Sequence, residues 1–174
     1  MKLFSAIALA AVVTMAAGCG STPTSPTTTA LPTSYTFTAS LLPANEVPVV
    51  TNAEASGSGT VTITMAVTRD SAQGITNATA SFVVNLSGFP NGTTLTGAHI
   101  HQAGPGVTAG VIVNTGLANG EIVMASGSSS FTKSGINVPV DTANNLISGA
   151  SGFYFNVHST TNTGGVARGQ LAKQ

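Results

Sequence analysis

Three histidines are the residues of this chain of 174 amino acids whose types and spacing could do chemistry. His99 and His101 stand two positions apart, and His158 ends the alternating run 153–158. In an extended strand, residues two apart project from the same face, roughly 7 Å apart along the backbone. The alternation puts each histidine on the more polar face of its strand, with Ala98 and Ile100 turned toward the core.

Three imidazoles on one surface suit a zinc or copper ion, whereas calcium and magnesium take oxygen ligands. The candidate metal ligands are therefore His99, His101 and His158. A structural interpretation stands beside this one, because imidazoles on a strand face can also hydrogen-bond to loop carbonyls and hold sheet edges. Spacing alone does not bring His158 near the other two.

Other kinds of chemistry find little support in the sequence. The five carboxylates are scattered, no Gly-x-Ser-x-Gly motif indicates a serine hydrolase, and no Gly-rich loop followed by Lys indicates phosphate binding. Only 6% of residues are charged and the formal net charge is zero. A nucleic-acid binder needs clustered Lys and Arg to neutralise phosphates, so the composition argues against that class.

The first residues have the pattern of an export signal. Lys2 is followed by an apolar run over 3–13 and then by Ala16-Ala17-Gly18 before Cys19, the one cysteine of the chain. This segment resembles a bacterial lipobox, although Ala16 stands where Leu is usual. A lone cysteine cannot form an intramolecular disulfide. We therefore expect a lipoprotein signal peptide over 1–18 and acyl chains on Cys19.

Residues 19–33 are rich in Ser, Thr and Pro, and we expect them to form an extended tether to a domain over 34–174. Lipid on Cys19 would hold that domain at a membrane surface, facing the periplasm or the exterior. Gly20 in place of Asp after the cysteine favours the outer membrane in a cell that has two. The expected partners are membrane lipid and an extracytoplasmic protein or matrix component.

Alternating apolar and polar residues predict a domain made of strands. Turn residues separate the alternating runs, and only one segment, Asp141–Ser148, has a helical pattern, with Asp141 or Thr142 as cap and Gly149 as stop. The Ser-rich run 127–130 is expected to be a loop. About seven to nine short antiparallel strands indicate an all-β sandwich or barrel; the predicted strands cover 35–41, 61–67, 80–86, 97–101, 110–114, 121–126, 152–158 and 167–172.

The chain resembles the CHRD domain family, named after chordin and present in many microbial secreted proteins. The resemblance runs from Tyr35 to Leu171 and rests on five motifs that lie at 42–49 (LPANEVPV), 57–60 (GSGT), 97–101 (GAHIH), 154–159 (YFNVHS) and 164–171 (GGVARGQL). It implies a module of secreted proteins whose biochemical role is largely undefined in microbes. A non-enzymatic binding or structural role is suggested instead by the lack of any catalytic constellation beyond the three histidines and Arg168.

A second, weaker resemblance is to copper/zinc superoxide dismutases, around 86–104 and again from His158 to Arg168. It implies that His99, His101 and His158 are copper ligands, that Arg168 guides an anion toward the metal, and that the fold is a Greek-key barrel. The sequence departs from those enzymes because it lacks a bridging histidine, a zinc cluster and a disulfide. These departures argue against a cycling dismutase and leave a mononuclear copper or zinc site.

Several hypotheses therefore remain open. The first is a surface-anchored, non-enzymatic sandwich, immunoglobulin-like or superoxide-dismutase-like in plan, with a binding or envelope-structural role. The second is a copper- or zinc-binding protein with a role in redox defence, which would carry any enzymatic activity the chain has. A carbohydrate- or matrix-binding module ranks last, because aromatic residues make up only 5% of the chain.

Overall fold

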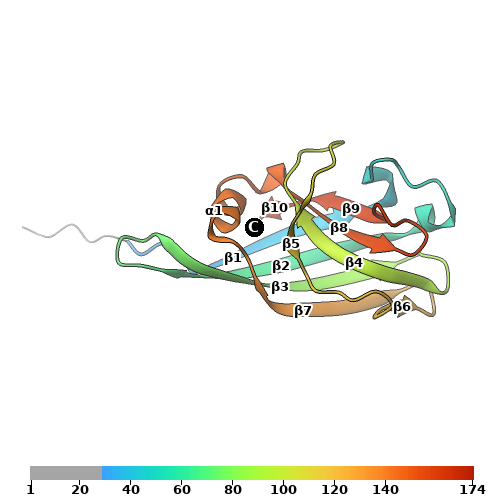
Figure 1. Ribbon diagram of the computed structural model, residues 1–174, viewed down its shortest axis with the longest axis horizontal. Coiled ribbons are helices and arrows are strands. Elements are labelled where there is room, and N and C mark those ends of the chain that lie inside the picture. Colours follow the sequence, from blue (N-terminus) through green and yellow to red (C-terminus); the bar gives the residue numbers. More distant parts are fainter. Residues whose placement is uncertain (1–28) are drawn as a thin grey trace, which may run out of the picture.

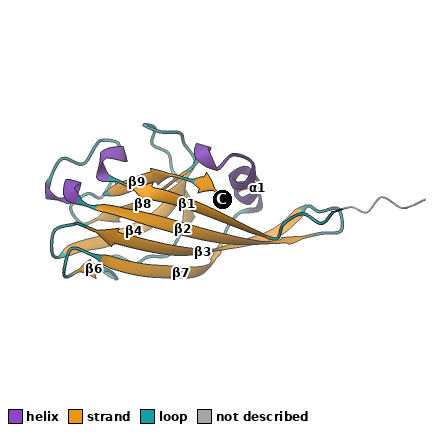
Figure 2. Ribbon diagram, turned by 180° about the vertical axis from the view of Figure 1, so that it is seen from behind, coloured by secondary structure: helices purple, strands orange, loops and turns teal. Residues whose placement is uncertain are grey.

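The computed structural model describes residues 29–174, in which two antiparallel sheets pack face to face and one helix lies at one end (Figures 1 and 2). The first sheet has the strand order β10-β1-β2-β3-β7 and the second has β5-β4-β8-β9, with β6 paired to β4. The strands are β1 (Ser34–Leu41), β2 (Ser58–Arg69), β3 (Ile75–Ser87), β4 (Thr93–His101), β5 (Val111–Asn114), β6 (Val123–Met124), β7 (Ser129–Asn137), β8 (Tyr154–Ser159), β9 (Ala167–Gln170) and β10 (Ala172–Lys173).

The core lies between the two sheets and follows from the alternation of the strands. In β2 and β3 every second residue is buried, because one face of the sheet meets the other sheet while its opposite face meets water. Phe82 of β3 stacks on Phe155 of β8 across the interface, with ring centroids 5.9 Å apart. The prediction of an antiparallel β-sandwich is confirmed.

The sheets form a sandwich and do not close into a barrel within residues 29–174. One backbone bridge joins them at an edge, where Leu42, directly after β1, pairs with Arg168 of β9 through two hydrogen bonds of 3.0 and 3.2 Å. The short 3-10 helices η1 (Pro43–Asn45) and η2 (Ala53–Ser56) follow this bridge, and η3 (Ala150–Gly152) precedes β8.

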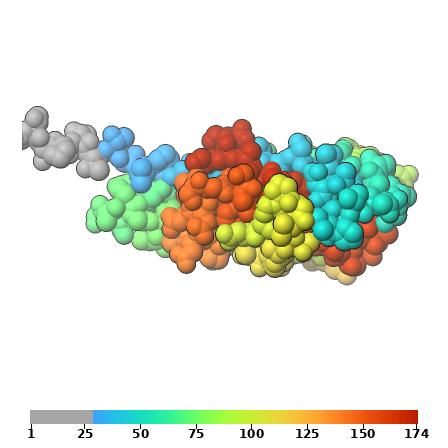
Figure 3. Space-filling model, turned by 90° about the horizontal axis from the view of Figure 1, so that it is seen from above, coloured from blue at the N-terminus to red at the C-terminus, as the bar shows by residue number. Residues whose placement is uncertain are grey.

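Most residues of strand β8 are buried on both faces of the sheet, as in the neighbouring β9. Phe155 and Val157 face the core, while Tyr154 and Asn156 face outward and are still only 2% exposed. The loop between β4 and β5, residues 102–110 (hereafter the β4–β5 loop), covers part of this outer face. Figure 3 shows this loop in yellow beside the teal segment that follows β1. Together with Arg168 and Gln170 of β9, the two line a pocket of about 480 Å³.

Three local predictions differ from the structure. The strand expected over 121–126 is limited to the two residues of β6. The run 127–130 was expected to be a loop, but Ser129 begins β7, a polar edge strand in which only Phe131 is buried. Pairing with β3 holds β7 in the sheet although its own sequence has little apolar alternation. Helix α1 (Val140–Gly149) has Pro139 as N-cap, without a side-chain cap, so neither Asp141 nor Thr142 caps it.

Candidate metal centre

Strands β4 and β8 carry the three histidines on the outer face of the second sheet. The two strands pair antiparallel, with Gly97 opposite His158, His99 opposite Asn156 and His101 opposite Tyr154. Residues that stand opposite one another across a pair project from the same face. Ala98 and Ile100 face the core, with exposures of 0% and 1%, as the alternation predicted.

The three histidines, hereafter the histidine cluster, lie close together. Nδ1 of His99 is 3.1 Å from Nε2 of His158. One ring nitrogen from each histidine can be chosen so that the three nitrogens lie within 4.8 Å of one another. The strand pairing therefore brings His158, which is 59 residues from His99 in sequence, next to the other two.

Two backbone carbonyls determine which nitrogens of the cluster hold lone pairs. The Nδ1 atom of His101 is 2.9 Å from the carbonyl oxygen of Ala109, and that of His158 is 2.8 Å from the carbonyl oxygen of Thr163. A carbonyl only accepts, so each Nδ1 donates and each neutral ring keeps its lone pair on Nε2. This is the arrangement by which protein groups orient histidine ligands toward a metal.

Asn156 lies between the two Nε2 atoms. Its Oδ1 is 3.0 Å from Nε2 of His101 and 3.2 Å from Nε2 of His158. An amide oxygen and two unprotonated imidazole nitrogens are all acceptors, so none of these three atoms can donate to another. Within the cluster, only Nδ1 of His99 is placed to donate a proton, to Nε2 of His158. A cation would satisfy such a group. Without one, turning the amide by 180° would let its NH₂ donate to both rings.

The environment favours the uncharged forms of His99 and His158 near neutral pH. The pKa of His99 is lowered to about 4, chiefly by burial and to a smaller extent by the neighbouring His158 and His101. Burial and His101 also lower the pKa of His158, although its bond to the Thr163 carbonyl opposes this. A metal has to displace a proton from a protonated imidazole, so neutral rings are ready ligands.

His101 is covered by a stack of planar groups. Its ring lies parallel to that of Tyr154, with an interplanar angle of 8° and centroids 4.6 Å apart. The guanidinium carbon of Arg168 is 3.4 Å from the centre of the same tyrosine ring. Arg168 is 2% exposed, and its Nη2 donates to the carbonyls of Gly104 and Val107. The anion-guiding role expected of Arg168 stays a prediction.

A buried carboxyl lies near this stack. Glu46 is 4% exposed, and its Oε1 has no hydrogen-bond partner within the described residues. Burial raises the pKa of Glu46 to about 7, although Arg168 and Asn156 act in the opposite direction. The carboxyl therefore holds a proton over a wider pH range than an ordinary glutamate.

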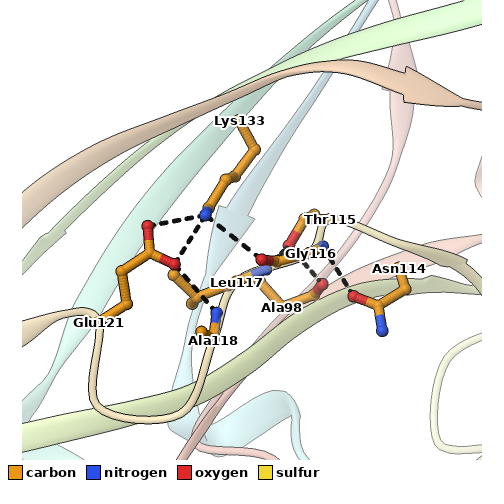
Figure 4. A network of polar contacts seen from close by, with 8 residues as sticks. All are labelled: Ala98, Asn114, Thr115, Gly116, Leu117, Ala118, Glu121 and Lys133. Atoms are coloured by element: carbon orange, nitrogen blue, oxygen red, sulfur yellow. Dashed lines mark hydrogen bonds and ion pairs between the residues drawn. The ribbon is translucent and has the colours of Figure 1, made fainter.

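The backbone of β4 beside His99 is anchored from outside the cluster (Figure 4). The Thr115 side chain is fully buried and donates to the Ala98 carbonyl at 2.8 Å. Lys133 stabilises the turn that follows Thr115, because its Nζ donates hydrogen bonds to the Gly116 carbonyl and the Glu121 carboxylate. This network fixes the end of β5, whose Asn114 pairs with His99.

Sequence reasoning found the three histidines but missed the groups that orient them. Asn156 shares the period-two face of Tyr154 and His158, and that pattern was the available signal for its position. Nothing in the sequence indicates the roles of the Ala109 and Thr163 carbonyls, since any residue type supplies one. The burial of Glu46 was not predicted either.

The predicted signal peptide, Cys19 and most of the predicted tether lie outside the described residues. Over residues 29–174, no helix has both the length and the apolar character needed to cross a bilayer.

The comparisons with known proteins give one match. A family model described as CHRD domain matches residues 37–171. No curated protein and no solved structure matches the chain. The similarity to superoxide dismutases thus remains a resemblance of sequence motifs. Because the family match spans both sheets and all three histidines, the chain belongs to the CHRD domain family.

Proposed function

We propose that this CHRD domain binds one copper or zinc ion through Nδ1 of His99, Nε2 of His101 and Nε2 of His158. The observation that carries the proposal is the approach of one nitrogen from each ring to within 4.8 Å of the other two. A trigonal ion with bonds of about 2.05 Å holds its ligand atoms about 3.5 Å apart. Small rotations of the rings would reach that geometry.

The surroundings of the cluster support this ligand set. The carbonyls of Ala109 and Thr163 leave the Nε2 lone pairs of His101 and His158 free, and Asn156 adds a third acceptor between them. Three neutral nitrogen ligands favour copper or zinc over magnesium or calcium. A three-ligand site also leaves a coordination position open, which an ion needs for exchange or redox chemistry.

Calorimetric titration of the full chain in detergent with Cu²⁺, Cu⁺ and Zn²⁺ tests the proposal. We expect one equivalent to bind with micromolar or tighter affinity, and His99→Ala to weaken binding at least a hundredfold. Gln102→Ala is the matched control, because Gln102 is exposed and adjoins His101 in sequence. No binding tighter than micromolar, or equal binding by His99→Ala, would mean that the cluster is a structural hydrogen-bond network.

We also propose that acyl chains on Cys19 anchor the domain to a membrane surface outside the cytoplasm, where it meets a protein or matrix partner. The lipobox-like sequence before Cys19 supports the anchor. Cys19→Ser should move the protein from the membrane fraction to the soluble fraction, whereas Ser21→Ala, two positions later, should leave it in the membrane. A Cys19→Ser chain that stays with the membrane would place the anchor elsewhere.

A further inference from the structure

The β4–β5 loop is held by side chains from two strands of the second sheet, β8 and β9. The Nε2 of Gln170 donates to the carbonyl of Ala103 at 3.0 Å. The Nη2 of Arg168 donates to the carbonyls of Gly104 and Val107 at 3.0 and 2.8 Å. At the far end of the loop, the Ala109 amide donates to the Tyr154 hydroxyl at 3.3 Å. The loop is therefore bonded along most of its length.

His101 and Arg168 lie on opposite faces of Tyr154. His101 stacks at 4.6 Å between ring centroids, and the Arg168 guanidinium carbon lies 3.4 Å from the tyrosine centroid. Two groups at these separations would overlap if both occupied one face. Tyr154 is thus clamped between the imidazole and the guanidinium, with cation–π attraction on the Arg168 side.

The loop and the stack meet at His101. The carbonyl that holds the proton on Nδ1 of His101 belongs to Ala109, near the end of the β4–β5 loop. Arg168 holds two other carbonyls of that loop and also supports the ring on which His101 stacks. The two carbonyl bonds come from one nitrogen, Nη2, whereas the contact with Tyr154 uses the flat face of the guanidinium, which a lysine ammonium does not reproduce.

We propose that Arg168 is a positioning residue that fixes His101 in its Nδ1–H tautomer, with the Nε2 lone pair directed at the histidine cluster. It acts through the β4–β5 loop and through Tyr154, without touching the ion. The consequence for affinity rests on the proposed metal site, whereas the tautomer is a property of the metal-free protein.

Two-bond ¹H–¹⁵N spectra of the metal-free full chain in detergent measure the tautomer of each histidine. We expect wild-type His101 to carry its proton on Nδ1, and Arg168→Lys to shift it to a mixture of both tautomers. His158 is an internal control, because its Nδ1 bonds Thr163 in a different loop. Copper affinity should fall by about tenfold to a hundredfold in the same variant.

Arg69→Lys provides the matched substitution. Arg69 likewise bonds loop carbonyls, those of Pro32 and Gln73, and the hydroxyl of Tyr35, but it lies in β2 of the other sheet. It should change neither the His101 tautomer nor the affinity. If Arg168→Lys fails to fold, Tyr154→Phe keeps the ring stack, removes the hydroxyl that holds Ala109, and should cause a smaller shift of the same kind.

The outcomes separate the two proposals. A tautomer shift in Arg168→Lys, together with no metal binding by the wild type, would support the positioning role and overturn the metal site. Metal binding by the wild type with an unchanged His101 tautomer in folded Arg168→Lys would overturn the positioning role alone. Loss of affinity without a tautomer shift would also overturn it, since Arg168 would then act by another route.

Discussion

The lack of a side chain at Gly97 determines how much space the His99 ring has within the histidine cluster. A Cβ built at this position would lie 2.9 Å from Cε1 of His99, a distance at which one of the two groups has to move. Gly97 also pairs directly with His158 across β4 and β8. The absence of a side chain here leaves the space that the His99 ring occupies while its Nδ1 lies 3.1 Å from Nε2 of His158.

Gly97→Ala should therefore weaken metal binding by about tenfold while leaving the fold intact, because the added methyl displaces only one ring. Calorimetric titration with Cu²⁺ measures the change. Gly110→Ala, where an added Cβ has nothing within 4 Å, should bind as the wild type does. Equal affinity in both variants would show that the His99 ring does not need this space.

Glu46 and His99 give opposite pH dependences to folding. The pKa of Glu46 is raised from 4.5 to about 7, so between these pH values the folded protein holds a proton on Glu46 that the unfolded chain releases. The contribution of protonated Glu46 to the free energy of unfolding is therefore lost as the pH rises from about 4.5 to 7. The pKa of His99 is lowered from 6.5 to about 4, so between these pH values His99 is protonated in the unfolded chain and neutral in the folded protein. Its contribution is lost as the pH falls from about 6.5 to 4.

Glu46→Gln should separate the two effects in the metal-free protein. At pH 8 it should raise the free energy of unfolding by about 1–3 kcal/mol, because burying the charged carboxylate of Glu46 destabilises the folded wild type at that pH. Near pH 4.5, where Glu46 is protonated in the folded wild type, this gain should vanish. Urea unfolding with chelator present, at several pH values, measures both. Glu121→Gln should show the opposite sign at pH 8, since its bond to Lys133 lowers the pKa of Glu121.

A lower stability of Glu46→Gln at pH 8 would contradict this account. It would mean that the carboxylate of Glu46 forms a favourable ion pair with Arg168 whose attraction exceeds the cost of burial.

At the scale of elements, the sequence predicted the faces of strands better than their partners. The period-two pattern placed His99 and His101 on one face and Ala98 on the other, because alternation follows from strand geometry alone. The pairing of β4 with β8 has no local signal, since it joins segments about 60 residues apart through a register fixed by the whole sandwich. For this reason the spacing of the residues did not predict the approach of His158, which only the resemblance to superoxide dismutases implied.

Strand β7 and helix α1 also show that local sequence patterns do not determine every element. The serines that begin β7 have low strand propensity, and pairing with β3 decides their conformation. The start of α1 was sought at a polar capping side chain, whereas the chain uses Pro139, whose carbonyl accepts from the Ala143 amide at 2.9 Å. Tertiary contacts override local preferences at both places.

The edge at which the two sheets meet depends on Gly169. A Cβ at this residue of β9 would collide with the backbone carbonyl of Ser40 in β1. Gly169→Ala should therefore push β9 from β1 and lower the free energy of unfolding by about 2–3 kcal/mol. Denaturant unfolding measures this. Gly164→Ala, which has free space around it, should stay within about 0.5 kcal/mol of the wild type.

For the whole molecule, metal binding and folding are coupled, because the three ligands come together only when β4 and β8 are paired. An ion present at 100 times its dissociation constant stabilises the folded state by about 2.7 kcal/mol. For a domain of this size that corresponds to a rise in Tm of about 5–10 °C. Thermal unfolding with and without Zn²⁺ should show the rise in the wild type and not in His99→Ala. An equal rise in both would place the ion elsewhere.

The contact between Tyr154 and His101 gives the protein an intrinsic optical probe. The chain contains no tryptophan and two tyrosines, so its ultraviolet emission comes from Tyr35 and Tyr154. Tyr154 stacks on a proposed ligand, whereas Tyr35 bonds Arg69 in the other sheet. Paramagnetic Cu²⁺ would quench the fluorescence of Tyr154 on binding, and closed-shell Zn²⁺ would not. A Tyr35→Phe chain would then show the occupancy of the site by emission alone, without any added dye.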